Sequence, residues 1–132
     1  MRLTRRYRFA ASHRLDTPAL TADQNRKLYG KCNNPYGHGH DYVLDVTLDG
    51  PLDASGQVVH RTELDTLVAE RVLVRLDHKN LNQEMPDAVA TTENLAYAVR
   101  DLLAKDWPLQ ARLRKVRISE TERNIFELEM NS

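Results

Sequence analysis

Alternation of apolar and polar positions with a period of two residues predicts two long strands in the first part of the chain. The first covers residues 3–13, with apolar side chains and His13 on one face, interrupted by Arg5, and arginines on the other. The second covers residues 38–48, with apolar residues and two histidines on one face and aspartates on the other. If the strands pair antiparallel, arginines and aspartates meet across the ladder.

Apolar positions spaced by three and four residues predict two helices. The first covers residues 62–75, and Thr62 and Asp65 at its start resemble a capping box. The second covers residues 92–106. Either of two threonines at its start can serve as the N-cap: Thr91 and Thr92.

Two further strands, at residues 112–120 and 124–130, are predicted to close the chain. No repeat, low-complexity tract or linker divides the sequence, so we expect a single domain over residues 1–132. The order β-β-α-α-β-β predicts an α+β fold, with a four-stranded antiparallel sheet and two helices on one face.

Composition limits the class of protein. The 132 residues contain 19 Lys and Arg against 19 Asp and Glu, so the formal net charge is zero. This balance argues against binding nucleic acid or an anionic membrane by bulk electrostatics. No apolar stretch approaches the roughly 20 residues that span a bilayer. The first fifteen residues contain five arginines and no apolar signal segment, so we expect a soluble cytoplasmic protein.

Three histidines fall on the apolar faces of the predicted strands: His13, His38 and His40. In the His-Gly-His segment, residues two apart share a face and lie about 7 Å apart along the strand. A third imidazole from the neighbouring strand can complete a zinc site with a free fourth position. The alternative is three hydrogen-bonded core histidines, but the recurrence on one face favours the metal site.

The single cysteine, Cys32, excludes an internal disulfide and lies just before the His-Gly-His segment. The residues that follow it, Asn33, Asn34 and Pro35, predict a turn that places the thiol at the mouth of the metal site. Three roles remain open: catalytic base, fourth zinc ligand, or small buried hydrophobe. A fourth thiolate ligand would close the site and make the zinc structural.

Other polar residues are candidates for the same site. Asp77 and His78 follow the first predicted helix and form either a proton relay to a cysteine or a solvated turn. Glu120 continues the inward parity of Val116 and Ile118. Because an unpaired inward carboxylate is costly, Glu120 either binds a ligand with a pair of donors, has a structural partner, or lies on a frayed, exposed end.

Five blocks of sequence resemble the 6-pyruvoyltetrahydropterin synthase family in order and spacing, across nearly the whole chain. They are Phe-Ala-Ala-Ser-His-Arg-Leu (9–15), Cys-Asn-Asn-Pro-Tyr-Gly-His-Gly-His (32–40), Leu-Asp-His-Lys-Asn-Leu (76–81), Thr-Thr-Glu-Asn (91–94) and Glu-Thr (120–121). The related 6-carboxytetrahydropterin synthases of 7-deazapurine (queuosine) biosynthesis typically have three residues between the cysteine and His-Gly-His. This chain has five, which favours the pyruvoyl branch of tetrahydrobiopterin biosynthesis.

The resemblance implies roles for individual residues. His13, His38 and His40 would bind Zn²⁺, and Cys32 would be the proton-abstracting thiolate. Asp77 and His78 would complete its relay, Glu120 would anchor the pyrimidine edge of the pterin, and Thr91 and Thr92 would lie at its rim.

The resemblance also implies an activity and an assembly. The activity would be a zinc-dependent carbon–oxygen lyase that converts 7,8-dihydroneopterin triphosphate to 6-pyruvoyltetrahydropterin. The fold would be the tunnelling fold, a homohexamer built as a dimer of trimers with active sites between subunits. Alternatives are the carboxy-forming branch and a non-catalytic zinc or pterin-binding module. His60 and Tyr36 depart from the family pattern; His60 is either exposed or locally bonded, or an additional ligand.

Overall fold

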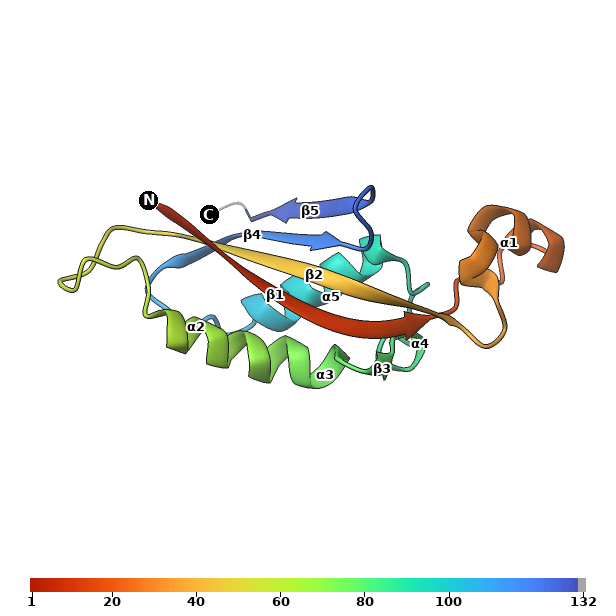
Figure 1. Cartoon of the computed structure of the whole chain (residues 1–132), viewed down its shortest axis with the longest axis horizontal. Helices are drawn as coiled ribbons and strands as arrows, with labels where there is room; N and C mark the ends of the chain where they lie inside the picture. The colour runs from red at the N-terminus through yellow and green to blue at the C-terminus, as the bar shows by residue number, and fades with distance from the viewer. Residues whose placement is uncertain (131–132) are drawn as a thin grey trace.

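The computed structural model describes residues 1–130 as a long twisted sheet with helices along one face (Figure 1). The sheet order is β3-β1-β2-β4-β5, and every neighbouring pair is antiparallel except β1 with β3. In chain order, the elements are β1 (Arg2–His13), α1 (Ala22–Tyr29), the 3-10 turn η1 (Gly30–Asn33), β2 (His38–Asp49), α2 (Arg61–Val68), the π-helical turn η2 (Ala69–Leu73), α3 (Val74–Leu76), β3 (Lys79–Asn80), α4 (Leu81–Glu84), α5 (Thr92–Ala104), β4 (Arg112–Ser119) and β5 (Ile125–Glu129).

The predicted pairing of the first two strands is confirmed. β1 and β2 run antiparallel over twelve residue pairs, and Arg6 lies opposite Asp45. The Arg6 guanidinium donates two hydrogen bonds to the buried Asp45 carboxylate, at 2.8 and 3.1 Å. Arginines and aspartates therefore meet across the ladder and fix the register of the two strands that carry the histidines.

Arg5, which breaks the apolar pattern of β1, has a partner in the helical layer. Its guanidinium donates to both oxygens of Asp65 in α2, at 2.6 and 2.8 Å, and the Tyr7 hydroxyl donates to the same carboxylate at 2.7 Å. The predicted capping box of Thr62 and Asp65 is therefore wrong: the N-cap is His60, without a side-chain bond, and Asp65 ties α2 to β1.

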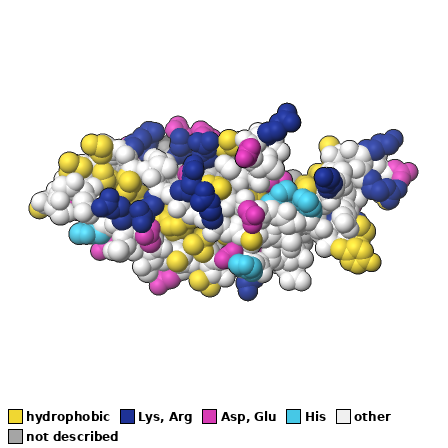
Figure 2. Space-filling model, viewed as in Figure 1, with side chains coloured by type: hydrophobic (Ala, Val, Ile, Leu, Met, Phe, Trp, Pro, Cys, Tyr) yellow, Lys and Arg dark blue, Asp and Glu magenta, His cyan; other side chains and the backbone are white. Residues whose placement is uncertain are grey.

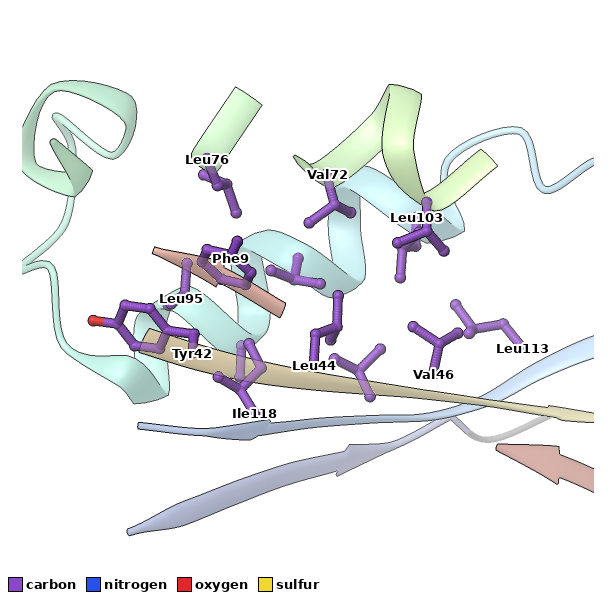
Figure 3. Packing of buried hydrophobic residues seen from close by; sticks show 14 of the residues in the cluster. Phe9, Tyr42, Leu44, Val46, Val72, Leu76, Leu95, Leu103, Leu113 and Ile118 are labelled. Atoms are coloured by element: carbon purple, nitrogen blue, oxygen red, sulfur yellow. The ribbon is translucent and has the colours of Figure 1, made fainter. Parts of the chain in front are cut away.

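The apolar core lies between the sheet and the helices (Figure 3). Leu44 and Ile118 point from the strands toward Val72, Leu95 and Leu103 of the helical layer, and all five side chains are fully buried. Burial of this apolar area is the main force that holds the layers together. The helices at residues 62–75 and 92–106 correspond to α2–η2–α3 and α5, with Thr91 as the N-cap of α5.

The α+β class is confirmed, but the four-stranded antiparallel sheet and the simple β-β-α-α-β-β order are wrong. The fifth strand, β3, contains only two residues, which pair parallel to β1 at Ala11 and Ser12. A two-residue strand has no periodicity to detect. The sequence prediction also missed α1 and the short α4.

Within residues 1–130, no helix has the length and apolar character needed to cross a membrane.

Candidate metal centre

One end of the β1–β2 ladder brings three imidazoles together. His13 and His38 are direct cross-strand partners, and His40 lies opposite Ala11. The His40 ring is in edge contact with both others, with ring centroids 4.9 Å from His13 and 4.7 Å from His38. The strand register thus places three potential metal ligands on one face, as the parity of the sequence predicts.

His13 presents a free nitrogen to this cluster. The ring is 1% exposed, and Nδ1 lies 2.8 Å from the backbone oxygen of Ala90. Because a carbonyl only accepts, Nδ1 carries the hydrogen and Nε2 keeps a lone pair. This Nε2 is buried without a hydrogen-bond partner among the described residues. Burial also lowers the pKa of His13, which keeps the ring neutral, and a neutral imidazole is the form that binds a metal.

Four side chains gather their ligand atoms within 4.8 Å of one another: His13, Cys32, His40 and Glu120. The His40 Nε2 atom lies 3.1 Å from a Glu120 oxygen and 3.8 Å from the Cys32 sulfur. Burial lowers the pKa of His40, as it does that of His13. This donor set fits a divalent metal that accepts nitrogen, sulfur and oxygen ligands. His38 adjoins the group through its ring but is not one of its four members.

Cys32 lies in η1, directly after α1, and the predicted turn follows it, where the Gly37 amide donates to the Asn34 carbonyl at 2.9 Å. Its side chain is half-buried, and the loop leading to β2 holds it at the metal cluster. Burial, and then the Glu120 carboxylate, raises the pKa of the Cys32 thiol. The chain's own residues therefore favour the thiol over the thiolate.

Glu120 follows β4 and faces the cluster, at the inward position that strand parity predicts. The Thr92 hydroxyl donates to a Glu120 oxygen at 2.8 Å, and Thr92 itself is buried at the start of α5. Thr91 has a separate structural role, because its hydroxyl accepts a hydrogen bond from the Asn94 amide. The start of α5 and the end of β4 are thus joined at the Glu120 carboxylate.

Asp77 and His78 lie beyond β1, at the parallel edge of the sheet. The Asp77 carboxylate accepts from the Ala10 amide at 2.9 Å and lies 3.1 Å from His78 Nδ1. The His78 side chain is 82% exposed. Among residues 1–130, neither side chain has a hydrogen bond to Cys32, so the predicted relay is not assembled within one chain.

Tyr42 is a residue of the site that the sequence prediction treated only as core. Its ring lies 5.6 Å from the His40 ring, and its buried hydroxyl has no hydrogen-bond partner within the described part of the chain. Burial, followed by the Glu120 carboxylate, raises the pKa of Tyr42 well above its ordinary value, so the phenol stays protonated. Its place two residues after His40 was the available signal.

The two departures from the family pattern lie outside the metal cluster. The His60 side chain is 59% exposed, and its Nε2 atom lies 3.8 Å from an Asp53 oxygen; within residues 1–130, His60 is not part of the metal cluster. Tyr36, in the loop between Cys32 and β2, is 97% exposed.

Comparisons with known proteins agree with this geometry. The family model of 6-pyruvoyl tetrahydropterin synthase matches residues 2–131. The 6-pyruvoyl tetrahydrobiopterin synthase of Homo sapiens is 45% identical over 127 residues, 93% of this chain and 87% of that protein. The structure of Caenorhabditis elegans 6-pyruvoyl tetrahydropterin synthase superposes with a TM-score of 0.90 at 35% identity, over 99% of this chain and 96% of that one.

A relative with a different name covers a smaller part of the chain. The dihydroneopterin monophosphate aldolase of Pyrococcus furiosus is 34% identical over 93 residues, 70% of this chain and 76% of that protein. The chain therefore belongs to the 6-pyruvoyl tetrahydropterin synthase family.

Proposed function

We propose that this protein is a zinc-dependent lyase that converts 7,8-dihydroneopterin triphosphate to 6-pyruvoyltetrahydropterin with elimination of triphosphate. The relatives matched over nine-tenths of the chain are named as synthases of this type. The observation that carries the proposal is the buried, unpartnered Nε2 of His13, which lies within reach of three further ligand atoms. A buried lone pair without a donor is costly unless a ligand binds there.

We propose His13, His38 and His40 as the zinc ligands. Two observations support this set. His13 and His38 are cross-strand partners, and the His40 ring is in edge contact with the rings of both. When bound, zinc supplies Lewis acidity to oxygen atoms of the substrate and a positive charge that favours the thiolate of Cys32.

Other residues of the site would bind the substrate and move protons. Cys32, next to His40, would take and return protons on the substrate side chain. Glu120 would accept hydrogen bonds from the guanidine-like edge of the pterin, and Thr92 holds that carboxylate in place. Thr91, which caps α5, would lie at the rim of this pocket.

Asp77 and His78 would form the proton relay, but with the Cys32 of another subunit. The exposure of His78 supports this arrangement, as does the absence, among residues 1–130, of a hydrogen bond from either residue of the pair to Cys32. It agrees with the homohexamer, a dimer of trimers with the tunnelling fold, that the family resemblance implies. The sheet ends in the edge strand β5, and unpaired edges of this kind are satisfied when subunits join their sheets.

The test is to incubate the zinc-loaded protein with 7,8-dihydroneopterin triphosphate and to analyse the products by mass spectrometry. We expect 6-pyruvoyltetrahydropterin and released triphosphate, and none of either from protein stripped of metal. A carboxylated pterin with acetaldehyde would instead identify the 6-carboxytetrahydropterin branch. Cleavage of a monophosphate substrate would identify an aldolase. Bound substrate without any product would leave a pterin-binding module.

Replacement of Cys32 by Ala separates the roles of the thiol. As a base, Cys32 contributes on the order of 10²–10⁴-fold to the rate, so the variant should lose turnover and keep about one zinc per chain. Loss of zinc from Cys32→Ala would show that the sulfur is a ligand and the site closed. Metal content by elemental analysis, measured with turnover on the same sample, distinguishes the two outcomes.

A further inference from the structure

A cavity of about 580 Å³ adjoins the metal centre on the side of α1. Its walls come from the end of β1, from α1 and η1, and from the loop that leads into β2. The residues that line it are Arg14, Arg26, Gly30, Lys31, Asn33, Asn34, Pro35 and His38. Within residues 1–130, three permanent cations and no acidic side chain line this cavity.

The cavity and the metal centre share residues and chain segments. His38 lines the cavity, and its ring is 4.7 Å from the ring of His40 in the metal centre. Lys31 and Asn33 line the cavity and flank Cys32 in the sequence. A molecule bound at the metal centre therefore has the cationic cavity directly beside it.

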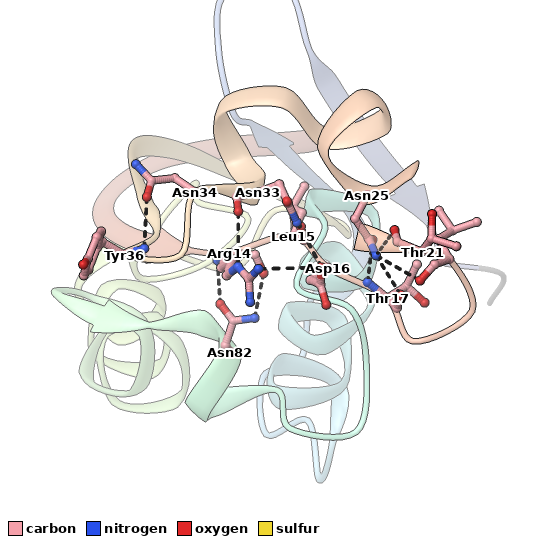
Figure 4. Close-up of polar contacts among 11 residues, drawn as sticks. Arg14, Leu15, Asp16, Thr17, Thr21, Asn25, Asn33, Asn34, Tyr36 and Asn82 are labelled. Carbon is pink, nitrogen blue, oxygen red and sulfur yellow. Dashed lines mark hydrogen bonds and ion pairs between the residues drawn. The ribbon is translucent and has the colours of Figure 1, made fainter. Parts of the chain in front are cut away.

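Arg14 is held in place at the cavity by contacts on both its backbone and its side chain (Figure 4). Its amide donates to the Asn82 side chain at 2.7 Å, and the Asn82 amide group donates back to the Arg14 carbonyl at 2.8 Å. The Arg14 Nε atom donates to the Asn33 carbonyl at 3.2 Å. Among residues 1–130, the terminal nitrogens of Arg14 have only a long contact of 3.8 Å with Asp16, so they remain able to bind an anion.

The other two cations, Arg26 and Lys31, are exposed and have weak or no ion pairs among the described residues. Arg26 pairs with Asp23 one turn earlier on α1, and both side chains are largely exposed. An exposed pair of this kind contributes little and is easily exchanged for a stronger partner. Lys31 has no acidic partner within 4 Å among the described residues. Lys and Arg side chains gather on the projecting α1 region, beside the histidine-bearing surface (Figure 2).

We propose that this cavity is the subsite for the triphosphate of the substrate, with Arg14, Arg26 and Lys31 as its cationic ligands. A triphosphate carries several negative charges and many acceptor oxygens, which a guanidinium fork and an ammonium satisfy. Its position beside His38 and Cys32 would hold the leaving group next to the carbon atoms that lose it. This inference rests on the proposed function for the identity of the anion, but not for the presence of an anion site.

The binding test uses inorganic tripolyphosphate as the probe. Zinc-loaded protein is titrated calorimetrically, and its zinc content is measured before and after, because free polyphosphate can chelate the metal. We expect Arg26→Gln and Lys31→Gln each to weaken binding about fivefold, and the double variant on the order of 20-fold. The matched control is Lys27→Gln, which removes a cation from α1 that does not line the cavity and should change affinity less than about twofold.

Two outcomes would overturn the inference: no binding of tripolyphosphate by the wild type, or an equal loss of affinity in Lys27→Gln, which would indicate bulk charge. Kinetics with 7,8-dihydroneopterin triphosphate keep this inference separate from the proposed function. Turnover with an unchanged KM in Arg26→Gln and Lys31→Gln would support the lyase and refute the subsite. Tripolyphosphate binding that the variants lose, without any turnover by the wild type, would support the subsite and refute the lyase.

Discussion

The hydrogen bond from His13 Nδ1 to the Ala90 carbonyl determines which nitrogen of this ring is available to a metal. It also orients the ring, as backbone carbonyls commonly do for metal-binding histidines. The segment that precedes α5 therefore orients the proposed ligand His13 of β1, although Ala90 is 77 residues away in sequence. No pattern in the sequence shows such a contact.

Strand parity predicted most of the site at the level of single residues. It placed His13, His38, His40 and Glu120 on one face. The structure brings the ligand atoms of His13, His40 and Glu120 together, whereas His38 adjoins them through its ring contact with His40. Parity did not indicate that the Tyr42 hydroxyl would reach the same end, because a tyrosine on an apolar face is equally typical of a core. It also did not show that Asp77 bonds to the Ala10 amide of β1, since this depends on where β3 pairs.

Glu120→Gln tests the carboxylate as a substrate anchor. The variant keeps the shape of the side chain but loses its charge, and a hydrogen bond to a charged group contributes about 1.5–3 kcal/mol, or roughly 10- to 100-fold in binding. We expect KM for 7,8-dihydroneopterin triphosphate to rise by about that factor, with zinc content unchanged. Glu122→Gln, in the exposed turn after Glu120, is the control. Loss of zinc from Glu120→Gln would show instead that the carboxylate is a metal ligand.

At the scale of elements, the cluster of Arg5, Tyr7 and Asp65 attaches the helical layer to β1. The pKa of Asp65 lies below its ordinary value of 3.8, mainly because the Arg5 guanidinium donates hydrogen bonds to the carboxylate. A carboxyl group with a depressed pKa in the folded state stabilises the fold above its unfolded pKa. That stability is lost as pH falls through the folded pKa, which lies below 3.8.

The lowered pKa of Asp65 predicts how the stability of an Asp65→Asn variant depends on pH. At pH 7, we expect the wild type to have the higher Tm. As pH falls below about 4, the advantage should shrink, because Asp65 binds a proton in the unfolded chain before it does so in the folded protein, whose pKa at this group is lower. Thermal unfolding between pH 7 and pH 3 measures the difference. Exposed Asp87→Asn is the control, and a Tm difference for Asp65→Asn that persists unchanged at pH 3 would contradict the ion-pair explanation.

The elements that were predicted correctly are those with long periodic patterns. β1, β2 and α5 each extend over three or more repeats of their period, and their amphipathic faces form the core. α1 was missed because it is short and largely polar, so it has almost no apolar stripe. Its available signal was the capping box of Thr21 and Gln24, where both reciprocal hydrogen bonds are present.

At the scale of the whole molecule, we propose that the active site is divided between subunits. In one chain, Cys32 contacts His40, whereas the Asp77–His78 pair lies at the sheet edge with His78 exposed. Under this proposal, a second chain supplies the Asp77–His78 pair to a site that contains Cys32.

Complementation between two inactive variants tests this division. Cys32→Ala and His78→Ala should each lack activity alone. When the two are co-expressed as mixed assemblies, some sites should combine an intact Cys32 from one chain with an intact His78 from another, and a measurable fraction of activity should return. Mixed assemblies without activity, shown by mass measurement to contain both chains, would place the relay within a single chain.

X-ray absorption at the zinc edge of the loaded wild-type protein tests the metal centre most directly. The predicted result is three imidazole nitrogens and a light fourth ligand near 2.0–2.1 Å, with no sulfur shell. These ligands correspond to His13, His38 and His40, with Cys32 free to act as a base. A sulfur scatterer near about 2.3 Å would contradict the account, because the thiol would then be bound to the metal and the open position lost.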